Sequence, residues 1–389
     1  MKETDNSVKL LTEKEHLGKK QINETKPATN GHGSFMSHYS DKQLQKYLLE
    51  GVSRTFALTI PQLPDPLEHT VSNAYLLCRI VDTIEDEPAL GPVQKREFCN
   101  MFYKVVSGDF PAGKFSQKLE GLLSSNTSDL EKELIYTTNR VVGITHGFSQ
   151  SHRDALKRCV KIMSEGMIYY QENASVKGLK DQAEMDDYCY HVAGVVGEML
   201  TELFCLHSPE IAKNRDKLMR RAVSFGQGLQ MTNILKDIWD DYERGACWLP
   251  RATFKNYGYS LSELKSQKSS PEFQEAIEEL IGIAHAHLQN AFEYTLLIPS
   301  HEKGIRKFCL WAIGMAVLTL RKIHRNIDYT DSLKVKITRN SVKGTILLSN
   351  LAVQNDLMLR AFFNITRAGL PYQEIESVKN IYGNNTNRN

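Results

Sequence analysis

The sequence has little that points to nucleic acid or to disulfide bonds. Its formal net charge is +2 over 389 residues, too close to neutral for the basic surface of a nucleic-acid-binding protein. The seven cysteines include no CxxC pair, and an odd number does not fit a disulfide framework. We therefore expect no nucleic-acid partner and a reducing, cytoplasmic environment.

Long hydrophobic runs are also missing. The longest, Phe308–Leu320, is bounded by Lys307 and Arg321 and falls short of the roughly 20 apolar residues that span a bilayer. Residues 1–38 are polar and lack the apolar segment of a secretory signal. We expect a buried core helix over 308–320, no transmembrane anchor, and only peripheral contact with any membrane.

Strand patterns are absent as well, since no alternating run is bounded by hairpin turns. Apolar residues recur at helical spacing instead. They predict helices over 65–87, 94–107, 129–146, 152–173, 184–206, 215–243, 260–267, 272–296, 302–326 and 342–363, with Ser40 capping a first helix. The expected architecture is all-α: a flexible polar tail over 1–38, one large helical domain over 39–365 around a central cavity, and a C-terminal tail over 366–389.

A polar stripe interrupts the apolar helix predicted over 65–87. Tyr75, Arg79, Asp82 and Asp86 follow at spacings of 4, 3 and 4, so a helix places them on one face. The other positions are apolar nearly all round, which is typical of a buried helix. The stripe then faces a cavity, because buried charges without partners are costly. The alternative is a solvated face on which Arg79 pairs with Asp82 or Asp86.

A second stripe of the same character lies on the helix predicted over 215–243. Its members are Gln230, Asn233, Asp237, Asp241 and Arg244, at spacings of 3, 4, 4 and 3. Upstream, Gly226 and Gly228 leave space for close helix packing or for a ligand. Alone, this stripe could also be a solvated face.

Together the two stripes indicate one kind of chemistry. Mg²⁺ prefers oxygen ligands and is usually held by one or two carboxylates plus substrate phosphates. Two Asp-bearing helices that face each other across a cavity could bind a diphosphate through Mg²⁺, with Arg79 and Arg244 on the phosphate oxygens. That arrangement suits ionisation of an allylic diphosphate, provided that a dry, aromatic-lined cavity shields the carbocation.

From about residue 50 to 345 the sequence resembles the squalene/phytoene synthase family. Four segments carry the resemblance. Ser53-Arg54-Thr55-Phe56 is similar to the family's arginine motif. The segment 82–86 (DTIED) is similar to the first aspartate-rich motif of the family, and the segment 233–241 is similar to the second. The segment 188–194 resembles the stretch that lies between these two motifs. The resemblance implies the isoprenoid synthase fold and a monomer.

The resemblance also implies roles for individual residues. It assigns Mg²⁺ to Asp82, Glu85, Asp86, Asp237 and Asp241; catalysis to Tyr75, Arg79 and Tyr188; substrate binding to Ser53, Arg54, Phe56, Gln230, Asn233 and Arg244; and NADPH to Lys336 and Arg339. Tyr75 and Tyr188 could instead be core tyrosines, and Lys336 and Arg339 could be surface charges of a loop.

The implied reaction joins two farnesyl diphosphates into presqualene diphosphate and reduces this to squalene with NADPH. The DTIED form and the basic stretch Val335-Lys336-Ile337-Thr338-Arg339 favour the squalene-forming branch, whereas residues 244–250 (RGACWLP) resemble the phytoene branch equally well. The alternatives are a phytoene, dehydrosqualene or presqualene diphosphate synthase without reductant, and a non-catalytic helical scaffold of the same fold.

Overall fold

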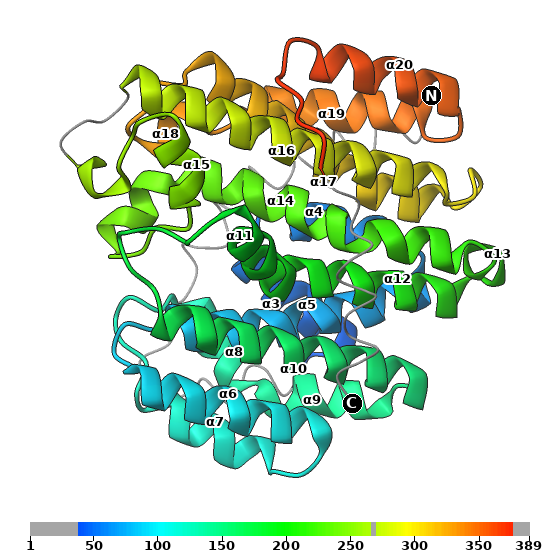
Figure 1. The fold of residues 1–389 in the computed structure, drawn as a ribbon. Helices are drawn as coiled ribbons and strands as arrows, with labels where there is room; N and C mark the ends of the chain where they lie inside the picture. The colour runs from blue at the N-terminus through cyan, green and yellow to red at the C-terminus, as the bar shows by residue number, and fades with distance from the viewer. Residues whose placement is uncertain (1–37, 266–269, 376–389) are drawn as a thin grey trace, which may run out of the picture.

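The computed structural model describes residues 38–265 and 270–375, drawn in colour in Figure 1. Within these ranges the chain forms helices and no strand, with one isolated bridge between Leu179 and Pro250. The predicted all-α fold is confirmed. The tail predicted over 1–38 lies outside the described residues except for its last position, and so does most of the tail predicted over 366–389.

The helices follow the chain in an order that stacks them in layers (Figure 1). They are α3 (Asp41–Val52), α4 (Phe56–Thr59), η1 (Ile60–Gln62), α5 (Asp65–Asp86), α6 (Pro92–Ser107), α7 (Ala112–Glu120), α8 (Asp129–Tyr136), α9 (Thr138–Gly147), α10 (Gln150–Glu172), α11 (Gln182–Cys189), η2 (Tyr190–Gly194), α12 (Val195–His207), α13 (Pro209–Ala212), α14 (Arg215–Glu243), α15 (Arg251–Asn256), η3 (Leu261–Glu263), α16 (Pro271–Leu296), α17 (Lys303–Arg325), α18 (Ser332–Val335), α19 (Arg339–Ala352) and α20 (Asp356–Arg367).

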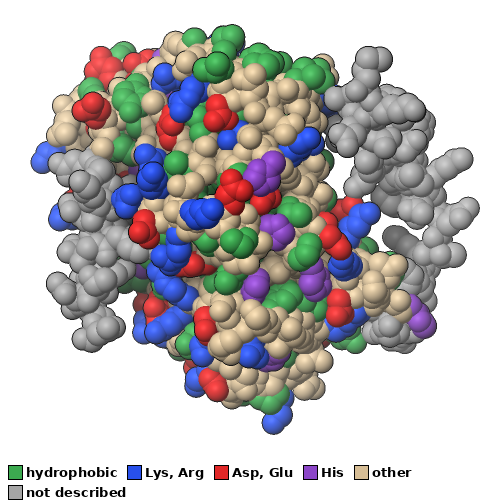
Figure 2. Space-filling view, turned by 90° about the vertical axis from the view of Figure 1, so that its right-hand side faces the viewer, with side chains coloured by type: hydrophobic (Ala, Val, Ile, Leu, Met, Phe, Trp, Pro, Cys, Tyr) green, Lys and Arg blue, Asp and Glu red, His purple; other side chains and the backbone are tan. Residues whose placement is uncertain are grey.

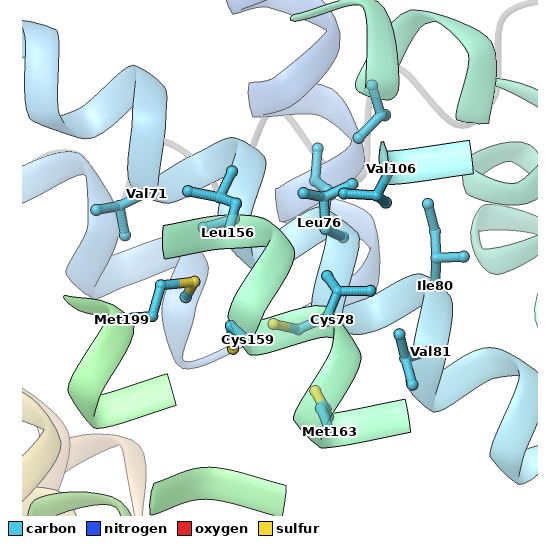
Figure 3. Packing of buried hydrophobic residues seen from close by; sticks show 14 of the residues in the cluster. Val71, Leu76, Cys78, Ile80, Val81, Val106, Leu156, Cys159, Met163 and Met199 are labelled. Carbon is cyan, nitrogen blue, oxygen red and sulfur yellow. The ribbon is translucent and has the colours of Figure 1, made fainter. Parts of the chain in front are cut away.

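Helix α5 is buried along most of its length. Pro66 lies in its first turn, a position where the missing N–H costs nothing, and Glu87 follows its last residue. Leu76, Ile80 and Val81 have no exposed surface. Figure 3 shows this apolar packing, in which α5 meets α10. The polar stripe therefore lies on a helix that is otherwise in the core, as predicted.

The helix predicted over 184–206 is continuous but contains a π turn, η2, between α11 and α12. A Cβ on Gly226 would lie 2.1 Å from the carbonyl oxygen of Ala193 in this turn, and a Cβ on Gly197 equally close to that of Ala222. Of the two roles predicted for Gly226, close helix packing or space for a ligand, the structure shows close helix packing. It holds η2 and α12 directly against α14.

Three predicted helices differ from the structure. The stretch 129–146 divides at Thr137 into α8 and α9. The stretch 342–363 divides before Asp356, because the Asn355 side chain accepts the Met358 N–H at 3.0 Å and starts α20, which continues to Arg367. In the described part of the predicted helix 260–267, residues 260–265, only the short turn η3 forms.

Among the described residues, one helical segment, Gln182–His207, is long and apolar enough to raise the question of membrane insertion. The run Phe308–Leu320 lies in α17 and is mostly buried, which confirms the predicted core helix. Gln182–His207 passes a length-and-composition test for a membrane span, yet half of its most apolar window is buried inside the protein. It packs between α10 and α14 as a core helix does.

A buried arginine links the turn before α17 to the turn between α19 and α20. Arg306 on α17 is 1% exposed and donates to the Ile298 carbonyl at 2.8 Å, the Val353 carbonyl at 3.0 Å and the Asp356 carboxylate at 2.7 Å. The turn before α17 and the turn between α19 and α20 are therefore fixed to the same side chain.

Candidate active site

A cavity of about 880 Å³ opens between α5, α10, α11 and α14. It brings together most of the predicted site residues: Arg79, Asp82, Glu85, Asp86, Tyr188, Gln230, Asn233, Asp237, Asp241 and Arg244. Apart from Tyr75, the members of both polar stripes thus line one space, and neither stripe is an ordinary solvated face.

The charged side chains of the two stripes interact electrostatically across the cavity. Burial alone would lower the pKa of Arg244 on the α14 side, but the carboxylates of Asp241, Asp86 and Asp237 outweigh burial and raise it. Asp86 belongs to α5, so its charge reaches the other stripe. Tyr188 lies between them: burial chiefly, and then Glu85, Asp241 and Asp86, raise the pKa of its hydroxyl well above the usual value.

Burial raises the pKa of several carboxyl groups in the cavity. Burial raises the pKa of Asp82 to about 7, against the opposing effect of Arg79. Burial likewise raises the pKa of Asp241 to about 6, although the hydrogen bond and positive charge of Arg244 act to lower it. Burial and the neighbouring Asp86 raise the pKa of Glu85. Such shifts arise where negative charges crowd in a poorly solvated place, so the site favours added positive charge.

The oxygen-rich side chains fit Mg²⁺ that is shared with a substrate. In residues 38–265 and 270–375 no three His, Cys, Asp or Glu side chains converge into a chelating group. Mg²⁺ does not need one, because it commonly takes one or two carboxylates and completes its shell with water and phosphate. Asp82 and Asp86 on one wall and Asp237 and Asp241 on the other meet this requirement.

The aromatic wall of the cavity is built by three rings. Tyr188 stacks on Trp248, with centroids 4.3 Å apart and planes at 7°, and meets Tyr170 edge-on at 5.0 Å. Trp248 follows α14 and is positioned by the backbone pairing of Leu179 with Leu249, N to O 2.9 Å. The sequence prediction missed Trp248 and Tyr170, because neither belongs to a stripe.

Other supporting residues were also missed. Glu131 on α8 pairs with Arg79, whose Nη1 lies 3.5 Å from Asp82. Gln171 on α10 donates to the Glu85 carboxylate. Their only sequence signal is polarity on helices that turn out to border the cavity.

The rim next to α5 is organised by Glu87. Its buried carboxylate accepts the Ser124 N–H at 2.9 Å, the Ala89 N–H at 2.8 Å and the Thr127 hydroxyl. Burial opposes ionisation, but these hydrogen bonds, that of Thr127 foremost, lower the pKa of Glu87. Glu87 thereby holds the loop that brings Asn126 and Thr127 to the cavity.

The arginine motif lies beside the cavity without lining it. The Ser53 hydroxyl accepts the Phe56 N–H at 3.0 Å, and the Phe56 ring packs on Tyr75 with centroids 5.1 Å apart. The Tyr75 hydroxyl is 3.5 Å from the Val52 carbonyl oxygen. Arg54 is exposed at this turn, and Tyr75, which the turn contacts, lies one helical turn before Arg79 on α5.

Lys336 and Arg339 also lie outside the described cavity. Both are exposed, and the segment before them is fastened to α14. The Trp239 indole donates to the Tyr329 carbonyl at 2.8 Å, and the Ser332 hydroxyl to Asp240 at 2.8 Å. The segment before the basic stretch therefore packs on α14, the helix that carries Asp237 and Asp241.

Comparison with known proteins identifies the group to which this arrangement belongs. A family model described as squalene/phytoene synthase matches residues 49–341. The squalene synthase of Schizosaccharomyces pombe is 29% identical over 323 residues, covering 80% of this chain and 66% of that protein. The Saccharomyces cerevisiae squalene synthase is 27% identical over 307 residues, covering 78% and 66%. The chain thus spans about two thirds of the length of these curated relatives.

Solved structures share the fold at lower identity. The ligand complex of TcSQS superposes with a TM-score of 0.68 and 21% identity, covering 88% of this chain and 96% of that one. A ligand-bound dehydrosqualene synthase gives a TM-score of 0.59 and 19% identity, covering 82% and 99%. The helical layers around the cavity are therefore an established architecture.

Proposed function

The chain belongs to the squalene/phytoene synthase family, a family of prenyltransferases, and we propose that it joins two farnesyl diphosphates into presqualene diphosphate and reduces this to squalene with NADPH. One observation carries the proposal: a single cavity holds the carboxylates of two facing helices, two arginines and a stacked aromatic wall. The likeness to two yeast squalene synthases supports the choice of product.

We propose that Asp82, Asp86, Asp237 and Asp241, with Glu85 beside them, hold Mg²⁺. Bound Mg²⁺ would stabilise the departing diphosphate as a Lewis acid. Arg79 and Arg244 would contact the phosphate oxygens from opposite walls, and the Glu131 pair keeps Arg79 directed at the site. Arg54, Ser53 and Phe56 would act at the edge, while Gln230 and Asn233 extend the polar wall along α14.

The aromatic wall would protect the carbocation. The rings of Tyr188, Trp248 and Tyr170 present π faces to a cation and, with Met167 and Val192, exclude water that would quench it. Because burial keeps the Tyr188 hydroxyl protonated, Tyr188 serves as a hydrogen-bonding group. The departed diphosphate is then the base that takes the proton lost when the cyclopropane closes.

The reduction would use Lys336 and Arg339 for NADPH. Phosphates suit exposed cationic side chains on a fixed backbone, and the Lys336 carbonyl accepts a hydrogen bond from Lys322, a third cation. The segment before these residues packs on α14, the helix that carries Asp237 and Asp241. Bound NADPH would supply the hydride for the reduction to squalene.

The direct test is product analysis. The full chain is incubated with farnesyl or geranylgeranyl diphosphate and Mg²⁺, with and without NADPH, and the products are identified by mass. Squalene from farnesyl diphosphate that depends on NADPH supports the proposal. The same hydrocarbon with and without NADPH would reassign the chain to dehydrosqualene or phytoene synthesis, and no turnover of either substrate would favour the scaffold.

A further inference from the structure

The outer surface of α19 and α20 is apolar although it faces solvent. Most exposed apolar side chains elsewhere in the described residues stand apart along the chain, but six lie between Leu347 and Ile365. These six define the hairpin face: Leu347, Leu348, Leu351, Leu357, Met358 and Ile365. Leu357 is 79% exposed and Ile365 68%. A cluster of this kind marks an interaction surface more often than single exposed apolar residues do.

The hairpin face is not needed to hold the two helices in place. Both pack on α17 through other residues: Leu359 is buried, and Phe363 stacks on Phe292 with centroids 4.2 Å apart. Leu347 and Leu351 are four residues apart on α19, as are Leu357, Ala361 and Ile365 on α20, so each set follows one side of its helix. The helices lie side by side at the top of Figure 1.

The surface is also hollowed. A groove of about 280 Å³ runs between α17, α19 and α20, and Leu348 and Phe362 belong to its mostly apolar wall. In the space-filling view, hydrophobic side chains gather along the upper edge of the molecule, the level at which Figure 1 draws this hairpin (Figure 2).

The charges around the hairpin face are mainly positive. The hairpin itself, residues 339–367, has four basic residues, Arg339, Lys343, Arg360 and Arg367, and one acidic residue, Asp356, while Asp331, Lys334 and Lys336 precede it. Asp356 pairs with the buried Arg306, and Arg360 pairs with Glu293 of α16. The chain as a whole is nearly balanced, with 48 basic and 46 acidic residues, so this positive excess is local.

We propose that the hairpin face docks peripherally on a bilayer that contains anionic phospholipids. Leucine, methionine and isoleucine side chains enter the boundary between headgroups and acyl chains, while flanking lysines and arginines attract anionic headgroups. A protein partner would also accept the apolar residues, but the one-sided charge of the flank matches an anionic surface. The proposal goes beyond the reaction, and its test does not depend on turnover.

Vesicle co-sedimentation of the full chain tests the proposal. The chain should bind phosphatidylcholine vesicles that contain phosphatidylserine better than vesicles of phosphatidylcholine alone. The variant Leu351→Ser/Leu357→Ser/Ile365→Ser should lose vesicle affinity by about tenfold or more, because the apolar area that enters the bilayer is removed. The matched control Val93→Ser/Leu122→Ser/Leu206→Ser alters exposed apolar residues of other helices and loops and should bind as the unchanged chain does.

The charge contribution is tested separately. Lys334→Glu/Lys343→Glu should remove most of the preference for phosphatidylserine and leave the weaker binding to phosphatidylcholine. Four outcomes overturn the proposal: no vesicle binding by the unchanged chain, equal binding by the triple serine variant, binding that appears only after residues 376–389 are deleted, or a dimer in sedimentation analysis that the triple variant dissociates. The last two would assign the hairpin face to the chain's own C-terminus or to a second copy.

Discussion

Tyr188 and Trp248 lie face to face, with ring centroids 4.3 Å apart and ring planes at 7° to each other. Tyr188 lies in the last turn of α11, whereas Trp248 follows α14, so the stack joins two parts of the cavity wall that come from separate segments of the chain. An aromatic pair of this geometry contributes about 0.5–1.5 kcal/mol beyond the area that it buries.

Substitutions in this ring pair can distinguish the structural role of Tyr188 from the role of its hydroxyl in the reaction. Tyr188→Phe retains the stack, so the melting temperature should change little. Presqualene diphosphate formation should slow by about 10- to 10²-fold, because the hydroxyl's hydrogen bond to the charged diphosphate, worth about 1.5–3 kcal/mol, is lost. Trp248→Ala should cost about 3 kcal/mol of unfolding free energy and also reduce turnover. Tyr257→Phe, outside the cavity with its hydroxyl on Glu279, is the control. Normal turnover in Tyr188→Phe would show a core tyrosine only.

The facing carboxylates predict an unusual combination of effects. Asp82→Asn or Asp237→Asn should reduce turnover by more than about 10²-fold, because each removes charge from the proposed Mg²⁺ site. Without Mg²⁺, thermal stability should hold or rise, because burial and neighbouring carboxylates disfavour ionisation there. Glu243→Gln, the same charge change at an exposed position of α14, should leave turnover intact. A melting curve and a steady-state assay measure both effects, and near-normal activity in either Asp variant would disprove the metal assignment.

The basic stretch predicts a separation of the two half-reactions. Lys336→Ala/Arg339→Ala should preserve formation of presqualene diphosphate but weaken the second step, because each lost charge-assisted hydrogen bond costs about 1.5–3 kcal/mol of NADPH binding. Presqualene diphosphate should accumulate, and high NADPH should partly restore squalene. Lys334→Ala is the neighbouring control. Equal loss of both steps would mean that the stretch supports the fold.

A buried histidine predicts a pH dependence of stability. His287 on α16 is 4% exposed, and burial lowers its pKa from 6.5 to about 4, while its Nδ1 lies 2.8 Å from the Ser224 hydroxyl. Between pH 4 and pH 6.5 the unfolded chain binds a proton at this histidine that the folded chain does not. The contribution of the neutral His287 to the free energy of unfolding is therefore full above pH 6.5 and is lost as the pH falls toward 4. The loss should reach about 3 kcal/mol at most.

Denaturant unfolding at several pH values measures this contribution. In His287→Asn, whose side-chain amide can still meet Ser224, the decline in unfolding free energy between pH 6.5 and 4 should be smaller. His301→Asn, at a position that is exposed, should keep the decline of the unchanged chain. The assignment fails if the His287 variant and the unchanged chain show the same slope.

The sequence was sufficient for the parts of the site that repeat along a single helix. The spacing of Asp82 and Asp86, and of Asp237 and Asp241, on apolar helices predicted two buried polar faces, and one cavity contains both. Trp248 and Glu131 could not be predicted in this way, because they reach the cavity from separate segments and their role depends on how helices pack. Helix boundaries were missed for a local reason: the apolar pattern continues through Asn355, where a single side-chain cap starts a new helix.

Buried Arg306 has a consequence for how the chain unfolds. Separating the α19–α20 hairpin from α17 would leave a guanidinium in the interior without the Val353 carbonyl and the Asp356 carboxylate, and an uncompensated buried charge costs several kcal/mol. The hairpin should therefore not fray independently, and its backbone amides should exchange with solvent about as slowly as those of α17 near Arg306. It meets any partner as a rigid body, and its exchange between two copies of the chain is disfavoured.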